Sequence, residues 1–142
     1  MDRLLDQAAT GPVYLRRPDL AQLMVDTIHY QADSLDNYCL HAYAIMSNHV
    51  HLLVTPKVAV PRLTHSLKSF TASAANRILG VKGRSFWQDE SYDRLVRNRV
   101  EFERIQKYIE WNPVKAGLVA LPEEFPWSSA SRSAERTTGE RG

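Results

Sequence analysis

The fold is decided by residues 38–55, which read YCLHAYAIMSNHVHLLVT. Apolar runs lie on either side of Ser47-Asn48, and asparagine tolerates the left-handed backbone that tight turns require. The stretch therefore predicts two antiparallel strands joined by a two-residue turn, with Pro56 ending the second strand. That turn sets three cross-strand pairs, which are Met46 with His49, Ala44 with His51, and Ala42 with Leu53.

Helical patterns flank this hairpin on both sides. Pro18-Asp19 opens a helix that extends to about residue 31, and apolar residues recur on one face of a longer helix expected over 60–79. Residues 3–9 are expected to form a short helix, and residues 91–97 favour a further strand.

A last helix is expected over residues 99–111. Asn98 is suited to cap its first turn, and Glu101 stands three residues later, as in a capping box. Pro113 disfavours helical geometry at Asn112, so the helix is expected to end there. The order of elements predicts an α+β sandwich in which helices pack on an antiparallel sheet.

Length and composition limit the class of protein. The chain has 142 residues, enough for one domain over residues 1–130, and the polar segment 131–142 is expected to be a disordered tail. Its single cysteine, Cys39, excludes an internal disulfide framework and a CxxC zinc site. The first residues do not resemble a signal peptide, and no apolar run approaches the roughly 18 residues of a membrane-spanning helix. We therefore expect a soluble, intracellular protein with no membrane partner.

The charge is unevenly distributed along the chain. Residues 1–50 hold 3 Lys/Arg and 6 Asp/Glu, whereas residues 51–142 hold 15 Lys/Arg and 10 Asp/Glu. A basic half of this kind suits a polyanionic partner. The alternative is a solvated surface whose asymmetry is incidental, because residues clustered in sequence need not cluster in space.

His49 and His51 are candidate metal ligands. Residues i and i+2 of a strand face the same side, roughly 7 Å apart along the chain, so the two imidazoles can converge on one divalent cation. In the predicted hairpin Ala42 and Ala44 line the same face and leave room for a metal and a substrate. The alternative is a pair of structural histidines. A multi-histidine hydrolase centre is disfavoured, because only His65 follows this pair.

Tyr108 is a candidate nucleophile. A tyrosine hydroxyl can attack phosphorus, and Asn112, four residues later, shares the helix face and offers an oxygen ligand for a metal. In the alternative reading Tyr108 packs in the core beside Ile105 and Ile109, and Asn112 is only a pre-proline residue. Tyr92 is a competing nucleophile, but it has no ligand-type residue four positions later.

Four motifs occur together in one order. They are AIMSNHVHLLV at 44–54, FWQ at 86–88, YDRLVR at 92–97 and YIEWNPVKAGLV at 108–119. In this combination the sequence resembles the REP-associated tyrosine transposases, which belong to the single-tyrosine HUH superfamily, over about residues 10–130.

The resemblance implies a ferredoxin-like α+β fold, with helices on one face of a central antiparallel sheet. Family members begin with a strand ahead of a helical segment like residues 3–9. We therefore expect this chain to lack that central strand, either because its start lies further upstream, because the chain is truncated at its N-terminus, or because another segment fills the gap. Loss of a central strand would impair activity, and the alternative of a remnant that only binds DNA rests on it.

The resemblance also implies a function. His49 and His51 match the HUH pair, Tyr108 matches the catalytic tyrosine, and Asn112 matches a third ligand for Mg²⁺ or Mn²⁺. The enzyme would nick single-stranded DNA near a palindromic hairpin through a 5′-phosphotyrosine intermediate and transfer the strand. It would act as a monomer or homodimer in the bacterial cytoplasm, near the nucleoid.

Basic and aromatic residues downstream of the hairpin are candidate DNA contacts. Phe86, Trp87 and Trp111 could stack bases, although a packing role is equally compatible with the sequence. Two other functions remain open, a remnant that only binds DNA hairpins and a metal-dependent phosphodiesterase that uses water in place of Tyr108. The residues expected to contact DNA are Lys68, Arg84, Trp87, Arg94, Arg97, Arg104 and Lys107.

Overall fold

A computed structural model describes residues 1–9, 14–81 and 86–131, with the side chains of Tyr14 and of residues 88–92 excluded. Arg84 and residues 132–142 of the predicted tail lie outside the described residues. None of the described helices is long and apolar enough to cross a membrane. The elements are β1 (Arg3–Ala9), η1 (Tyr14–Arg16), α1 (Pro18–Asp33), β2 (Tyr38–Ile45), β3 (His49–Pro56), α2 (Val60–Leu79), β4 (Trp87–Leu95), α3 (Arg99–Lys115) and η2 (Pro122–Glu124).

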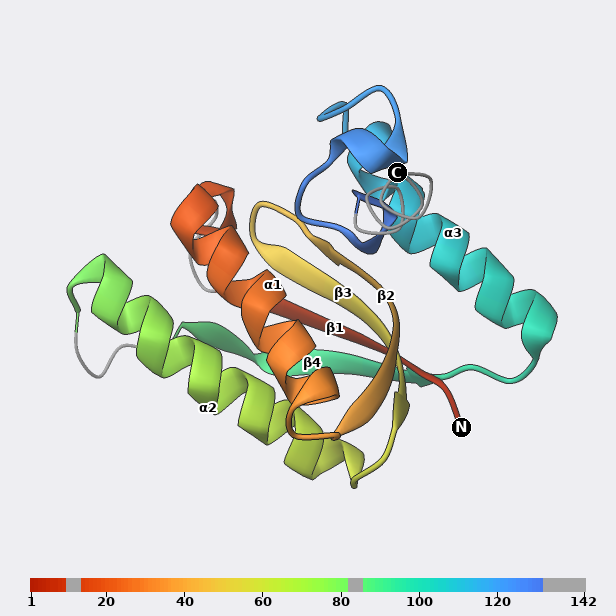
Figure 1. The fold of residues 1–142 in the computed structure, drawn as a ribbon, viewed down its shortest axis with the longest axis horizontal. Helices are drawn as coiled ribbons and strands as arrows, with labels where there is room; N and C mark the ends of the chain where they lie inside the picture. The colour runs from red at the N-terminus through yellow and green to blue at the C-terminus, as the bar shows by residue number, and fades with distance from the viewer. Residues whose placement is uncertain (10–13, 82–85, 132–142) are drawn as a thin grey trace, which may run out of the picture.

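The described strands form one antiparallel sheet in the order β2-β3-β1-β4 (Figure 1). The α+β class predicted from the sequence is therefore confirmed. Strand β1 lies inside the sheet, between β3 and β4. Its residue Asp6 is opposite His51 on one side and Tyr92 on the other.

The expectation that residues 3–9 form a helix and that a central strand is missing is wrong. Leucine, glutamine and alanine are good helix formers, so the local sequence favours a helix. In the fold, ladders on both sides and burial on both faces outweigh that preference. Leu5 packs into the core beneath α1 and α2, whereas Leu4 packs into the core beneath α3. Residues 3–9 themselves supply the strand that the sequence was expected to lack.

The predicted hairpin of β2 and β3 is confirmed. Ala44 pairs with His51 and Ala42 pairs with Leu53, as the two-residue turn requires. The backbone N–H of Met46 donates to the carbonyl of His49 over 2.8 Å, which closes the hairpin. Further from the turn, the register shifts between Leu40 and Ala42, so the strand carries a bulge there.

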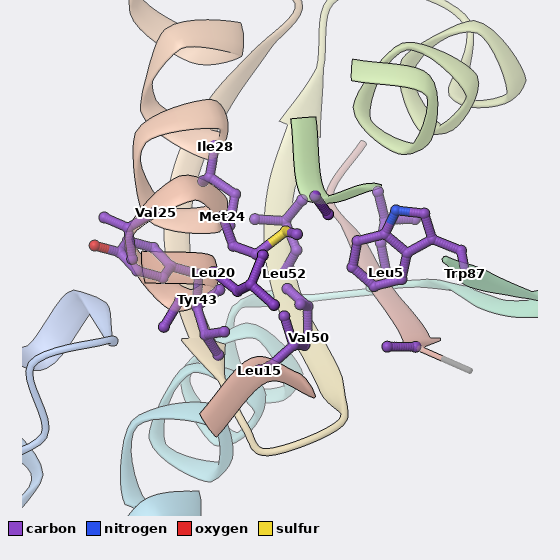
Figure 2. Close-up of a cluster of buried hydrophobic side chains, with 14 of the residues drawn as sticks. Leu5, Leu15, Leu20, Met24, Val25, Ile28, Tyr43, Val50, Leu52 and Trp87 are labelled. Atoms are coloured by element: carbon purple, nitrogen blue, oxygen red, sulfur yellow. The ribbon is translucent and has the colours of Figure 1, made fainter. Parts of the chain in front are cut away.

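Helices α1 and α2 lie side by side over one face of the sheet (Figure 1). Beneath them lies a large apolar core, in which Leu20, Met24 and Ile28 of α1 meet side chains from the sheet (Figure 2). The sheet side chains in this core include Leu5, Tyr43, Val50, Leu52 and Trp87.

Helix α3 covers the opposite face, so the expectation that all helices lie on one face is wrong. Ile105 and Ile109 of α3 pack with Ala42, Ala44 and Leu53 of the hairpin. The two alanines were expected to leave room for a metal and a substrate. Because they have small side chains, they instead let α3 approach the sheet closely, and they are fully buried.

Helix α3 begins as predicted but ends later. The Asn98 side chain accepts a hydrogen bond from the Glu101 backbone N–H over 2.9 Å, which confirms it as the cap. The predicted end at Asn112 is wrong, because the helix continues through Pro113 to Lys115. The Pro113 ring is buried, and the N–H of Ala116 donates to the carbonyl of Asn112 over 2.9 Å. These interactions offset the steric preference against helix before a proline.

Replacing Asn98 should destabilise the protein moderately. In Asn98→Ala the Glu101 N–H loses its acceptor, and the free energy of unfolding should fall by about 1 kcal/mol. Asn98→Ser, which keeps a capping oxygen, should lose less than half of that amount. Urea denaturation of the three proteins measures both effects, and equal loss in the two variants would contradict the capping role.

Candidate active site

His49 and His51, which follow the tight turn on strand β3, point toward each other. Strand β3 directs both side chains to the face that α3 covers, and their Nε2 atoms lie 3.1 Å apart. His51 is 6% exposed, whereas His49 is half-buried at the rim. The site is therefore closed beneath His51 and open to solvent beside His49.

The other ring nitrogen of each histidine faces an oxygen acceptor. Nδ1 of His51 lies 2.6 Å from Oδ1 of Asp6, and Nδ1 of His49 lies 3.0 Å from Oδ1 of Asn48. These acceptors favour hydrogen on both Nδ1 atoms, and in the neutral form of each ring that tautomer leaves a lone pair on Nε2. Two facing lone pairs at 3.1 Å repel unless a cation lies between them. A histidine held by a carboxylate through its other nitrogen is the usual arrangement of a metal ligand, so this donor set fits a divalent cation.

The surroundings of the His49 ring shift its pKa downward. Burial lowers its pKa, the neighbouring His51 lowers it further, and Asp6 opposes both effects. A lowered pKa favours the unprotonated imidazole, which is the form that binds metals.

Tyr108 lies beside the histidine pair, on α3. The centre of its ring is 5.7 Å from that of His51, in an edge-to-face arrangement. Tyr108 is 46% exposed, whereas the next inward-facing residue, Ile109, is fully buried. Tyr108 is therefore not the core residue of the alternative reading, and its position leaves it accessible to a substrate. The side chain of the competing Tyr92 lies outside the described part of the structure.

Asn112 follows Tyr108 by one helical turn and is half-buried. Its side chain as a metal ligand stays a prediction. Among the described residues there is no group of three or more histidine, cysteine, aspartate or glutamate side chains placed to hold a metal.

The aromatic residues proposed to stack bases separate into two groups. Phe86 and Trp87 are buried, and the indole N–H of Trp87 donates to Oγ1 of Thr71 over 2.8 Å. These two residues belong to the core, so Trp87 does not fit its expected role as a DNA contact. Trp111, in contrast, is 40% exposed on α3.

The basic residues expected to contact DNA also differ in their partners and in their position. Arg94 and Arg97 both pair with Glu101, at 3.2 and 3.8 Å. Lys68 lines an apolar cavity beneath α2, on the face of the sheet opposite the histidines. Among the expected DNA contacts that the structure describes, Arg104 and Lys107 lie exposed on the same helix as Tyr108.

Asp6 is the site residue that the sequence did not reveal. The rule that a metal-bound histidine donates its second N–H to a carboxylate would have prompted a search for an acidic partner. Six acidic residues precede the hairpin, however, and spacing does not choose among them. The partner becomes identifiable only once β1 is paired with β3.

Residues 17–112 match the family described as transposase IS200 like. The fold is similar to that of a REP-associated tyrosine transposase bound to a REP hairpin, with a TM-score of 0.71 and 17% identity over 96% of this chain and 80% of that one. It is also similar to a candidate transposase from Deinococcus radiodurans R1, with a TM-score of 0.56 and 22% identity over 78% and 88% of the two chains. No curated protein shows significant similarity to the sequence.

Proposed function

Because this chain belongs to the family of IS200-like transposases, we propose that it is a metal-dependent tyrosine transposase that cuts single-stranded DNA beside a hairpin and transfers the cut strand. The observation that carries the proposal is the convergence of two imidazole nitrogens, 3.1 Å apart, beside the exposed ring of Tyr108. Within the family, the sequence motifs favour the REP-associated branch. The hairpin in the related structure supports a palindromic DNA hairpin as the partner.

His49 and His51 would hold the cation, Mg²⁺ or Mn²⁺, and Asn112 would add an oxygen ligand from α3. When bound, the cation supplies Lewis-acid polarisation of the scissile phosphate. Asp6 fixes the orientation and tautomer of His51 through the 2.6 Å contact with its Nδ1. The residues of β1, β3 and α3 thus act together on one phosphate.

Tyr108 would act as the nucleophile. Its phenolic oxygen attacks phosphorus, the bond to the 3′ oxygen breaks, and a 5′-phosphotyrosine forms. The proton that the phenol loses balances the proton that the leaving 3′-hydroxyl gains. One phosphodiester replaces another, so a 3′-hydroxyl can later attack the phosphotyrosine and rejoin the DNA without ATP.

The structure removes the argument for a hairpin-binding remnant without activity. That alternative rested on the missing central strand, and residues 3–9 form a strand in the centre of the sheet. A water-dependent phosphodiesterase would use the same histidine pair, and the exposed ring of Tyr108 beside that pair favours the tyrosine mechanism over it.

The test is covalent capture of DNA. Purified protein is incubated with Mn²⁺ and a hairpin oligonucleotide that carries a single-stranded 5′ extension, and the products are separated on a denaturing gel. A label at the 3′ end should move with the protein, because the protein holds the 5′ phosphate of that fragment, whereas a label at the 5′ end should appear in a shorter, free strand. EDTA should abolish both products. Cleavage without a covalent band would contradict the tyrosine mechanism, and binding without cleavage would contradict the proposed activity.

A further inference from the structure

The outward face of α3 carries a row of residues that the catalytic site does not use. Arg104, Trp111 and Lys115 stand at positions −4, +3 and +7 relative to Tyr108, so they lie on the same side of the helix. All of them are exposed. At 1.5 Å per residue the row extends over about 16 Å of the helix axis, with Tyr108 in its middle.

Trp111 is unusual for a tryptophan in this chain. It is 40% exposed, whereas Trp87 is buried and Trp127 is half-buried against the core, and the Trp111 ring makes no hydrogen bond or aromatic contact with the described residues. A large flat apolar surface exposed to water beside a candidate nucleophile is typical of a binding surface rather than of a core.

The charges on α3 are distributed in a way that favours an anionic partner. Each acidic residue of the helix has a partner, since Glu101 pairs with Arg94 and Arg97, Glu103 pairs with Arg99 at 3.2 Å, and Glu110 accepts from Ser129 at 3.0 Å. In the part of the chain that the structure describes, three cations of α3 have no ion-pair partner, namely Arg104, Lys107 and Lys115.

We propose that the single-stranded DNA next to the scissile phosphate lies along this face of α3, with one base stacked on Trp111 and phosphates near Arg104 and Lys115. The proposal rests on the function proposed above, and it names the part of the substrate that α3 holds. An aromatic ring accepts any base and cations neutralise any phosphate, so the contact is independent of sequence. Its role is to place the scissile phosphate beside Tyr108.

The experiment measures DNA binding in a Tyr108→Phe background, which keeps the substrates intact. Three DNAs are compared: a hairpin with a single-stranded extension, the same hairpin without it, and a hairpin whose extension consists of abasic sites. Trp111→Leu should weaken binding of the first DNA about tenfold, because one base–aromatic stack is worth about 1–3 kcal/mol. It should leave binding of the other two unchanged, and Trp111→Phe should recover part of the loss.

Arg104 provides an independent arm of the same test. Arg104→Gln should weaken binding of both extended DNAs, because a phosphate contact does not need the base, and it should reduce the salt dependence by about one counterion. Arg99→Gln is the matched control on the same helix, because Arg99 is paired with Glu103. It should bind all three DNAs like the parent protein.

The outcomes separate the two proposals. If the Tyr108→Phe parent binds the extended hairpin and Trp111→Leu binds it equally well, the stacking role is wrong and the proposed function stands. If the parent binds none of the hairpins, the proposed function is wrong. Sedimentation velocity tests a further outcome. If Trp111→Leu converts a dimer into a monomer and leaves binding of the extended hairpin unchanged, this face of α3 is an interface between two copies, which also overturns the inference.

Discussion

A Tyr108→Phe protein should bind the extended hairpin as tightly as the unaltered protein and form no covalent adduct with it. The substitution removes only the hydroxyl, so the ring that lies 5.7 Å from His51 remains and the helix packing is undisturbed. Because the proposed reaction starts at that oxygen, strand cleavage should fall below detection. Denaturing gels report the adduct, and fluorescence anisotropy reports binding.

Tyr30→Phe is the control for this experiment. Tyr30 is 44% exposed, close to the exposure of Tyr108, but it lies on α1, where its ring stacks on Phe70. That variant should cut and transfer DNA normally. An adduct that persists in Tyr108→Phe would assign the nucleophile to another residue, with Tyr92 the first to examine. Cleavage that persists without an adduct would mean that water attacks the phosphate.

Replacing Asp6 by alanine should weaken Mn²⁺ binding about 10- to 100-fold, the usual effect of losing a carboxylate that orients a metal-binding histidine. Without Asp6 the buried His51 ring loses the acceptor at its Nδ1, and the alternative tautomer, which places hydrogen on Nε2, becomes accessible. Asp6→Asn keeps an oxygen acceptor at that position and should retain more of the affinity. Isothermal titration calorimetry measures the change without relying on catalysis.

Asp2 offers a matched control on the same segment. It stands four residues before Asp6, accepts a hydrogen bond from Thr55 and lies 3.7 Å from His41, away from the histidine pair. Asp2→Ala should bind Mn²⁺ like the unaltered protein. If Asp6→Ala binds Mn²⁺ normally while His51→Ala does not, Asp6 has no positioning role. Thermal melts of all variants separate a loss of metal binding from a loss of folding.

The hairpin was predictable because its information is local. A two-residue turn allows one register, and that register alone brings Ala44 opposite His51. The ends of α2 were predictable from local sequence as well. Gly80 adopts the left-handed conformation, with φ of 71°, that often follows the end of a helix. Strand β1 was missed because its two partners are distant in sequence. Alanines that pack beneath a helix also cannot be distinguished, in sequence, from alanines that line an open cavity.

The site was predictable to a smaller extent. That His49 and His51 face the same side followed from strand geometry alone. For Tyr108 and Asn112 the residue pattern left a structural role equally open, and the resemblance to a family favoured the catalytic one. The contact between Asp6 and His51 required the pairing of β1 with β3, and no local pattern encodes that register. The burial of Trp87 also depended on tertiary packing, because aromatic residues on a strand suit a core and a DNA surface equally well.

The central position of β1 also determines the order in which the molecule can fold. The hairpin of β2 and β3 can close early, but the ion pair between Arg3 and Asp93 joins residues 90 positions apart. At a translation rate of about 5–20 residues per second, β1 would wait roughly 4–18 s for β4 to be synthesised. The Asp6–His51 contact does not require β4, so the metal-binding side of the sheet can form before its outer strand is added. High contact order of this kind predicts slow folding.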